Sequence, residues 1–190
     1  MAVAILFSVL AVLLLIGVPV AFSLLGAALA TVLHMGMPTM VIALQTAAGA
    51  GSASLIAIPL FIFAGELMLR GGISDRLIAF AASLVGRLRG GLGQVNVLSS
   101  LFFGGVSGSA IADVSAIGGT MIPQMVSRGY GRDFAVNVSI TAALVALLVP
   151  PSHNLILFSA SAGGSISIAD LFAAGIVPAL LLTLALMATV

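Results

Sequence analysis

The stretch FFGGVSGSAIADVSAIGG, from Phe102 to Gly119, decides the fold of this chain. Apolar segments precede and follow it, but its glycine and serine content makes it a poor continuous helix. It also places one carboxylate, Asp113, inside an otherwise apolar region. An interruption of this kind predicts a turn between two helices rather than one helix running through.

The composition of the chain indicates the surroundings of this turn. Of 190 residues, 62% are hydrophobic and only 6% are charged, and the mean hydropathy is +1.36. A soluble domain carries about 25% charged residues. With so few charges, the chain is unable to cover a surface that faces water. The sequence therefore predicts an all-α integral membrane protein surrounded by lipid.

Arginines on both sides of the turn predict its topology. Four lie in residues 70–89, and two more lie at Arg128 and Arg132. The positive-inside rule places both segments in the cytoplasm. Residues 91–127 must then leave and return on the same side, yet two full crossings take about 40 residues and a turn. We expect a re-entrant helical hairpin at 91–127, with its tip buried in protein or lining a wet cavity.

A second interruption follows at Pro150-Pro151-Ser152-His153-Asn154. Two adjacent prolines break the helical hydrogen-bond ladder and leave carbonyl groups free. The sequence therefore predicts a discontinuous helix over residues 134–162. A hairpin tip and a broken helix together are the arrangement with which secondary transporters bind ions near the middle of the bilayer.

The remaining segments complete the predicted organisation. Residues 2–33 are expected to form one long or kinked crossing, 39–50 a short interfacial segment, and 55–69 a second span. Residues 73–88 predict an amphipathic surface helix capped by Ser74 and Asp75 and closed by Gly90-Gly91. We expect three parts: spans and interfacial helices at 1–90, a transport-domain half at 91–162, and a loop with a last span at 163–190.

Oxygen-bearing residues at the two interruptions are the candidate ion ligands. A hard cation such as sodium prefers carbonyl, hydroxyl and amide oxygens. Small residues at the tip also suit close helix packing, but packing does not require two prolines, so we favour a binding site. The predicted sodium ligands and neighbours are Ser107, Gly108, Ser109, Pro150, Ser152 and Asn154.

Charged and catalytic-looking residues have competing interpretations. Asp113 is either part of the functional site or a helix cap on the second arm of the hairpin. Glu66 and Arg70 are spaced as an i,i+4 ion pair. The Ser152-His153 pair lacks the third group and oxyanion hole of a hydrolase, so we expect no enzyme activity and no catalytic residue. A net charge of +1 gives no case for nucleic acid binding, and no ATP-binding motif is present.

Four segments carry a family resemblance: IPLFIFAGELMLRGGISDRL (58–77), LVGRLRGGLGQVNVL (84–98), the hairpin stretch, and MIPQMVSRGY (121–130). With the PPS that follows, they resemble the large membrane subunit of tripartite ATP-independent periplasmic (TRAP) transporters, within the ion-transporter superfamily. The resemblance implies the first of two inverted repeats in an elevator-type, sodium-driven carrier of the bacterial inner (cytoplasmic) membrane. It also implies a small four-helix membrane subunit and a periplasmic solute-binding protein as partners.

For the site, the resemblance implies one sodium site between the tip and the break, with the substrate carboxylate nearby. Asp113, Ser115 and His153 are the predicted substrate-proximal residues. We expect a multi-pass permease in contact with lipid, importing a small organic acid such as a dicarboxylate or a sugar acid. Sodium is the coupling ion, and no other metal or cofactor is expected.

The chain departs from the family pattern in two ways. Aliphatic residues precede PPS where relatives have hydroxyl groups, and His153-Asn154 follow it where many have apolar residues. Family members are also about twice as long, so we expect a piece of a longer chain. The alternatives are a binding-protein-independent dicarboxylate or citrate symporter half, or a non-transporting membrane assembly subunit.

Overall fold

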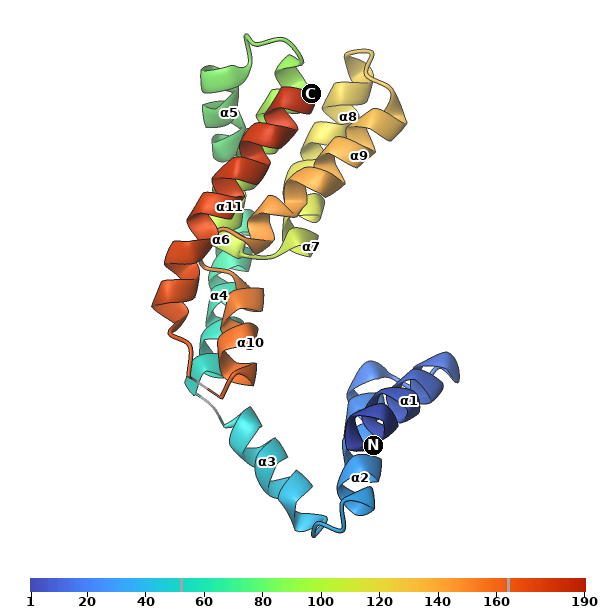
Figure 1. Ribbon diagram of the computed structural model, residues 1–190. Helices are drawn as coiled ribbons and strands as arrows, with labels where there is room; N and C mark the ends of the chain where they lie inside the picture. The colour runs from blue at the N-terminus through green and yellow to red at the C-terminus, as the bar shows by residue number, and fades with distance from the viewer. Residues whose placement is uncertain (52, 164) are drawn as a thin grey trace. The chain divides into compact units, whose positions relative to one another are not determined.

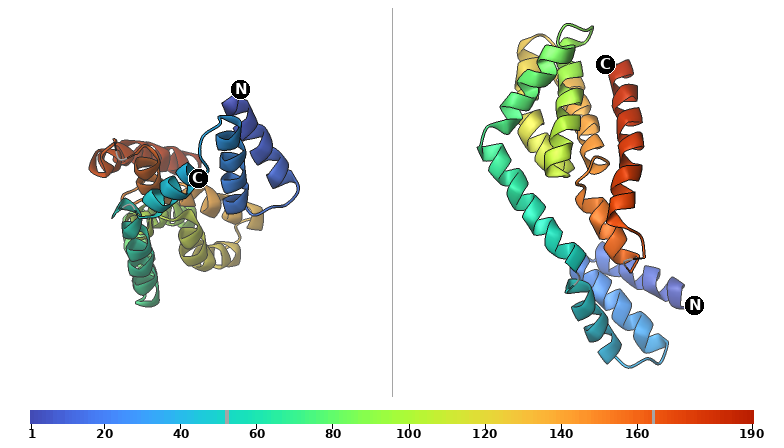
Figure 2. Two further views of the ribbon diagram at one scale, coloured as in Figure 1. Left: turned by 90° about the horizontal axis from the view of Figure 1, so that it is seen from below. Right: turned by 90° about the vertical axis from the view of Figure 1, so that its left-hand side faces the viewer.

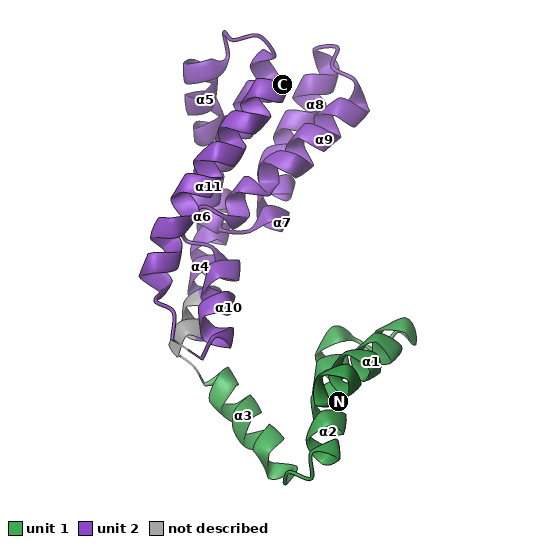
Figure 3. Cartoon of the chain, in the orientation of Figure 1, with its two compact units in different colours: residues 1–52 green, residues 53–190 purple. Residues whose placement is uncertain are grey.

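The computed structural model describes residues 1–51, 53–163 and 165–190, and these residues form helices and no β-strand. The chain divides into two compact units, Met1–Ser52 and Ala53–Val190 (Figure 3). Unit 1 contains three helices, and unit 2 contains the predicted hairpin, the predicted broken helix and the last span. This confirms an all-helical fold.

Unit 1 corrects the prediction of a single crossing over residues 2–33. The structure has two helices, α1 (Ala2–Leu15) and α2 (Val20–His34), which pack against each other. Gly17 adopts a left-handed conformation with φ 88° between them, which glycine reaches without steric cost. Pro19 then precedes the first turn of α2. The Gly-Val-Pro sequence therefore makes a turn, not a kink. The third helix, α3 (Met40–Ala50), matches the predicted short segment.

Unit 2 begins with α4 (Ala53–Arg70) and α5 (Ile73–Val85). Helix α5 confirms the predicted amphipathic helix, and its Ile78 and Ala81 side chains are buried against the rest of the unit. The predicted caps were wrong. Gly72, at φ 73°, is the N-cap, and α5 already ends at Val85. The chain must reverse direction before Ile73, and a left-handed glycine does this better than a serine hydroxyl.

The predicted hairpin is present as two antiparallel arms (Figure 1). The first arm is α6 (Gly91–Ser107). The second consists of α7 (Ala110–Asp113), the π-helical η1 (Val114–Gly118) and α8 (Gly119–Ser127). Every element of the second arm contacts α6. The hairpin shape confirms the turn predicted at the glycine- and serine-rich stretch.

The predicted discontinuous helix is also present. Helix α9 (Arg132–Ala143) continues as the short 3-10 turn η2 (Val145–Leu147), and α10 (His153–Ser161) resumes after the prolines. The last helix, α11 (Ile168–Thr189), contains Pro178. Helix α9 ends at Ala143 and a 3-10 turn follows. Pro150 and Pro151 then lack the N–H groups that would bond to the carbonyls of Ala146 and Leu147.

The core of unit 2 lies between α5 and the two arms of the hairpin. It contains Phe103, Ile117 and Met121, each with 0% exposure, together with Ile78, Ala81 and Val95. A smaller cluster of Val97, Val138 and Ala142 joins α6 to α9. The first arm of the hairpin is therefore central, and its neighbours surround it.

The two arginine-containing loops, 86–90 and 128–131, lie at the same end of unit 2 (Figure 2, right-hand view). The hairpin tip and the break lie away from that end. The hairpin arms therefore begin and end at the same end of unit 2, and the cytoplasmic placement of that end stays a prediction.

The outer surface of the helices is strongly apolar. Large hydrophobic side chains are exposed on the middle of α11, including Ile176, Leu181 and Leu184 at 49%, 63% and 63%. Within the described part of the chain, α11 is the one helix long and apolar enough to cross a membrane, and α1, α2 and α3 are apolar but shorter. Exposure on this scale is incompatible with a surface that faces water.

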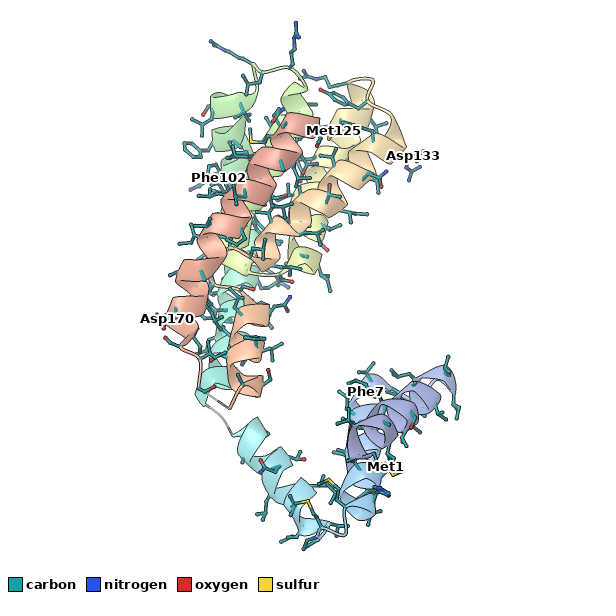
Figure 4. The ribbon with its side chains drawn as sticks, viewed as in Figure 1. Met1, Phe7, Phe102, Met125, Asp133 and Asp170 are labelled. Atoms are coloured by element: carbon teal, nitrogen blue, oxygen red, sulfur yellow. The ribbon has the colours of Figure 1, made fainter. Side chains whose placement is uncertain are left out.

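One buried hydrogen bond joins the hairpin to the broken helix and carries a stability prediction. Asn96 Nδ2 donates to Ser139 Oγ at 2.6 Å, and both residues are buried. Replacing Ser139 with alanine leaves the amide with only Met125 Sδ at 3.7 Å, on α8 (Figure 4). We expect the free energy of unfolding to fall by about 1–3 kcal/mol, which is the cost of leaving a buried donor unsatisfied.

Thermal unfolding of the intact purified protein measures this loss. Ser127→Ala is the control, because its exposed hydroxyl bonds only to Gln124 O within its own turn. An equal effect of the two substitutions would contradict the role of the Asn96–Ser139 bond.

Candidate ion and substrate site

The hairpin tip is formed by Ser107, Gly108 and Ser109. Gly108 ends α6 at φ 59°, a conformation that glycine favours. Ser109 is the N-cap of α7, and its hydroxyl accepts from Ala112 N at 3.4 Å. Ser107 Oγ accepts from Ser109 N, also at 3.4 Å. The sequence Ser-Gly-Ser thus ends one helix, turns the chain and starts the next within three residues.

The break in the second element is equally local. Ser152 is fully buried, and its hydroxyl donates to Leu147 O at 2.5 Å. This bond satisfies a carbonyl that the prolines leave without an N–H partner. Ser152 also precedes the first residue of α10, and its carbonyl accepts from Ile156 N. The Ser152 hydroxyl therefore satisfies a carbonyl at the end of the first half-helix, and the Ser152 carbonyl accepts the first hydrogen bond of the second half-helix, α10.

The tip and the break are in direct backbone contact. A Cβ atom placed on Gly108 would overlap the carbonyl oxygen of Pro151. One turn earlier on α6, a Cβ on Gly104 would lie 2.6 Å from Ala146 Cα. On the other side of the break, a Cβ on Gly175 of α11 would lie 2.5 Å from Leu148 O. These three glycines let α6 and α11 approach the broken segment more closely than any side chain would allow.

A cavity of about 300 Å³ opens beside this contact. Ser107 and Ser109 line it from the tip, His153 from the start of α10, and Gly65 and Glu66 from α4. The walls are otherwise apolar, with Phe103 and Ile111 among them. A few polar groups in an apolar cavity of this size are typical of a small-molecule site.

The predicted sodium residues fall into two groups. Ser107, Gly108, Pro150 and Ser152 lie at the junction of tip and break, where Ser107 and Ser152 are buried. Ser109 is part of the same tip and lines the cavity. Asn154 is exposed on α10. The tip therefore lies against the break, which is the arrangement that the family resemblance implies, and their role as ion ligands stays a prediction.

The predicted substrate-proximal residues are more dispersed. His153 lines the cavity, and its Nε2 is buried without a hydrogen-bond partner among the described residues. Ser115 is exposed, and its hydroxyl donates to Ile111 O at 2.8 Å. Asp113 is 1% exposed on the second arm. The side chain of Asp113 caps no helix: Ser109 caps α7, and Asp113, which precedes the π-helical η1, makes no side-chain cap hydrogen bond.

Sequence reasoning missed several polar residues of this region. Glu66 forms the predicted ion pair with Arg70 at 2.8 Å, and it also lines the cavity. Asn96, Ser99 and Ser100 are completely buried on α6. Their i, i+3, i+4 spacing inside an apolar helix was a readable signal, because residues at that spacing share one helix face.

The sequence of the chain matches a known protein family. Residues 7–190 match the model of the tripartite ATP-independent periplasmic transporter, DctM component. A putative TRAP transporter large permease protein of Haemophilus influenzae is 42% identical over 183 residues, covering 96% of this chain and 43% of that protein.

Two relatives with named substrates are similar as well. The 2,3-diketo-L-gulonate TRAP transporter large permease protein of Escherichia coli is 39% identical, over 92% of this chain and 41% of its own length. The C4-dicarboxylate TRAP transporter large permease protein of Rhodobacter capsulatus is 35% identical, over 94% and 43%. The chain thus spans about two fifths of the length of these relatives. With its hairpin, its broken helix and these matches, the chain belongs to the DctM-component family of TRAP transporters.

Proposed function

We propose that this chain forms the first repeat of the large permease of a sodium-coupled importer of small organic acids in the bacterial inner membrane. The family consists of transport permeases and not enzymes, and its members are integral membrane proteins. The observation that carries the proposal is the contact between Gly108 at the hairpin tip and Pro151 at the break. It places two interrupted helices, with their free carbonyls, beside a cavity.

Sodium would bind at this junction. Ser107 and Ser152 supply buried hydroxyls, and the chain around Gly108 and Pro150 supplies carbonyl oxygens of the kind that a hard cation prefers. Ser109 and Asn154 complete the proposed set from the two sides. The hydroxyl of Ser152 donates to Leu147 O, which leaves its lone pairs free to face an ion.

The substrate would occupy the cavity beside the ion. Relatives are named for 2,3-diketo-L-gulonate, sialic acid and C4-dicarboxylates, all of them organic acids. In this proposal a periplasmic binding protein delivers the acid, a small four-helix subunit supports the permease, and the hairpin and break move together as part of an elevator.

Reconstitution of the complete transporter tests this proposal. Proteoliposomes with the intact permease and the small subunit receive the binding protein, labelled dicarboxylates or sugar acids, and an inward sodium or potassium gradient. We expect uptake with the sodium gradient and binding protein together. Equal uptake in potassium would contradict sodium coupling. Uptake without the binding protein would indicate the simpler symporter, and no uptake by any mixture would indicate an assembly subunit.

His153 carries a separate prediction within the same assay. The residue lines the cavity, and its buried Nε2 has no hydrogen-bond partner among the described residues, so we propose that the imidazole turns to hydrogen-bond the substrate. Loss of one such bond costs about 1.4 kcal/mol, or a tenfold change in affinity. We expect His153→Ala to raise the KM for uptake about tenfold with the sodium dependence unchanged. His34→Ala, in unit 1, is the control. An unchanged KM would remove His153 from the substrate site.

A further inference from the structure

A row of buried oxygens inside the hairpin has no partners. Asn96, Ser99 and Ser100 on α6 are each 0% exposed, and Asp113 on the facing arm is 1% exposed. Asn96 Oδ1, both serine hydroxyls and both carboxylate oxygens of Asp113 lack a hydrogen-bond partner in the part of the chain that the structure describes. Buried polar atoms are nearly always paired, so a group of five unpaired oxygens requires an explanation.

The two serines are unusual within this chain. Hydroxyls in helices normally donate to the carbonyl one turn earlier. Ser139, Thr31 and Thr183 all do so, to Ala135, Ala27 and Ala179 at 2.7–2.9 Å. Ser99 and Ser100 do not. Their hydroxyls are therefore left free to face another group.

The three residues of α6 are close neighbours, and one of them lies beside Asp113. Ser99 and Ser100 follow Asn96 at i+3 and i+4, so all three lie on one face of α6 within about one turn. The Ser100 side chain lies beside the Asp113 carboxyl. The amide of Asn96 is oriented by its donation to Ser139, which leaves Oδ1 as an acceptor.

The charge of Asp113 also lacks a counterpart. The one ion pair found among the described residues joins Glu66 and Arg70, and both are exposed. A buried carboxylate without a partner costs several kcal/mol. A proton would neutralise it but would satisfy only one oxygen, whereas a cation attracts all the oxygens at once. A set of one carboxylate, two hydroxyls and one amide oxygen suits a small hard cation.

We propose that Asp113, Ser100, Ser99 and Asn96 form a second sodium site within the hairpin, distinct from the junction of tip and break. The proposal rests on the sodium-coupled transport proposed above. An ion here would neutralise Asp113 before the hairpin moves through the membrane. Binding of sodium at this site would also affect the contact between the hairpin and α9, because Asn96 is hydrogen-bonded to Ser139.

Direct binding of ²²Na⁺ tests the site. The intact permease with its small subunit is dialysed without substrate, with choline replacing sodium. We expect Asp113→Asn to bind one sodium ion fewer per permease than the wild type. Ser100→Ala should raise the half-saturating sodium concentration of that ion about tenfold. Thr120→Val, on the same arm with its hydroxyl bonded to Ala116 O, should bind as the wild type does.

Thermal unfolding separates loss of the site from loss of the fold. In sodium-free buffer, Asp113→Asn should be at least as stable as the wild type, because a neutral isostere removes an unpaired buried charge. Unchanged sodium binding by a folded Asp113→Asn would overturn the second site and indicate a protonated carboxyl. If the wild type bound no sodium at all, the proposed coupling itself would fail.

Discussion

Replacing Gly108 with alanine is expected to abolish transport and to destabilise the permease. The new Cβ would overlap the Pro151 carbonyl oxygen, which belongs to the backbone and has no rotamer with which to move aside. The residue would also keep φ near 59°, a left-handed conformation that costs a non-glycine residue about 1–2 kcal/mol. We expect the free energy of unfolding to fall by at least about 2 kcal/mol in total, because the steric overlap adds to the backbone strain.

Thermal unfolding and uptake in proteoliposomes measure the two effects of this substitution. Gly119→Ala is the matched control, since Gly119 lies in a helix at φ −56° and a Cβ there meets nothing within 4 Å. It should be neutral or slightly stabilising, because alanine is the better helix former. Wild-type behaviour of Gly108→Ala would contradict the contact between the tip and the break.

Phe103→Ala is the second substitution with a large expected effect. Phe103 is 0% exposed in the core between α5 and the hairpin arms, and it also forms part of the cavity wall. In lipid the loss comes from the void and the missing packing contacts more than from exclusion of water. We expect about 3 kcal/mol of destabilisation, together with weaker substrate binding as the wall of the cavity collapses or opens.

The control for this core substitution is Phe134→Ala, because Phe134 is 40% exposed on α9. It should change the unfolding temperature little. Comparison of the two variants by thermal unfolding, with substrate KM as a second readout, tests the core assignment. A similar shift in both variants would place Phe103 outside the core.

The two interruptions of the chain were predictable from sequence because each has a strong local cause. Two prolines remove consecutive backbone donors, and Ser-Gly-Ser supplies a left-handed turn followed by an N-cap. These causes act whatever surrounds them. The C-terminal end of α9 was less predictable. The α-helix changes to a 3-10 turn at Val145, and this turn packs closely against Gly104 of α6.

The first 33 residues show where composition misleads. A continuous apolar run of this length satisfies the requirement for one crossing, and Gly17 and Pro19 were interpreted as a kink. Hydropathy carries no information on whether a glycine adopts positive φ. The structure places Gly17 at φ 88° and packs α1 against α2, which a window of hydrophobicity does not distinguish from a bent helix.

The candidate site was predictable only in part. The two motifs predicted two interruptions, the family resemblance implied that they lie together, and Gly108 does contact Pro151. Asn96, Ser99 and Ser100 were missed because each is an ordinary residue for a membrane helix. Their spacing on one helix face was readable, but their significance depends on oxygens that have no hydrogen-bond partner among the described residues, which only the three-dimensional structure shows.

The glycines around the break have a mechanical consequence. Gly108 on α6 and Gly175 on α11 press backbone against the carbonyls of Pro151 and Leu148 from two helices. A contact between side chains absorbs a small displacement by changing rotamers, but a contact between backbones has no such slack. A displacement of the hairpin tip toward the break therefore requires the broken helix and α11 to shift as well, because the backbones already touch.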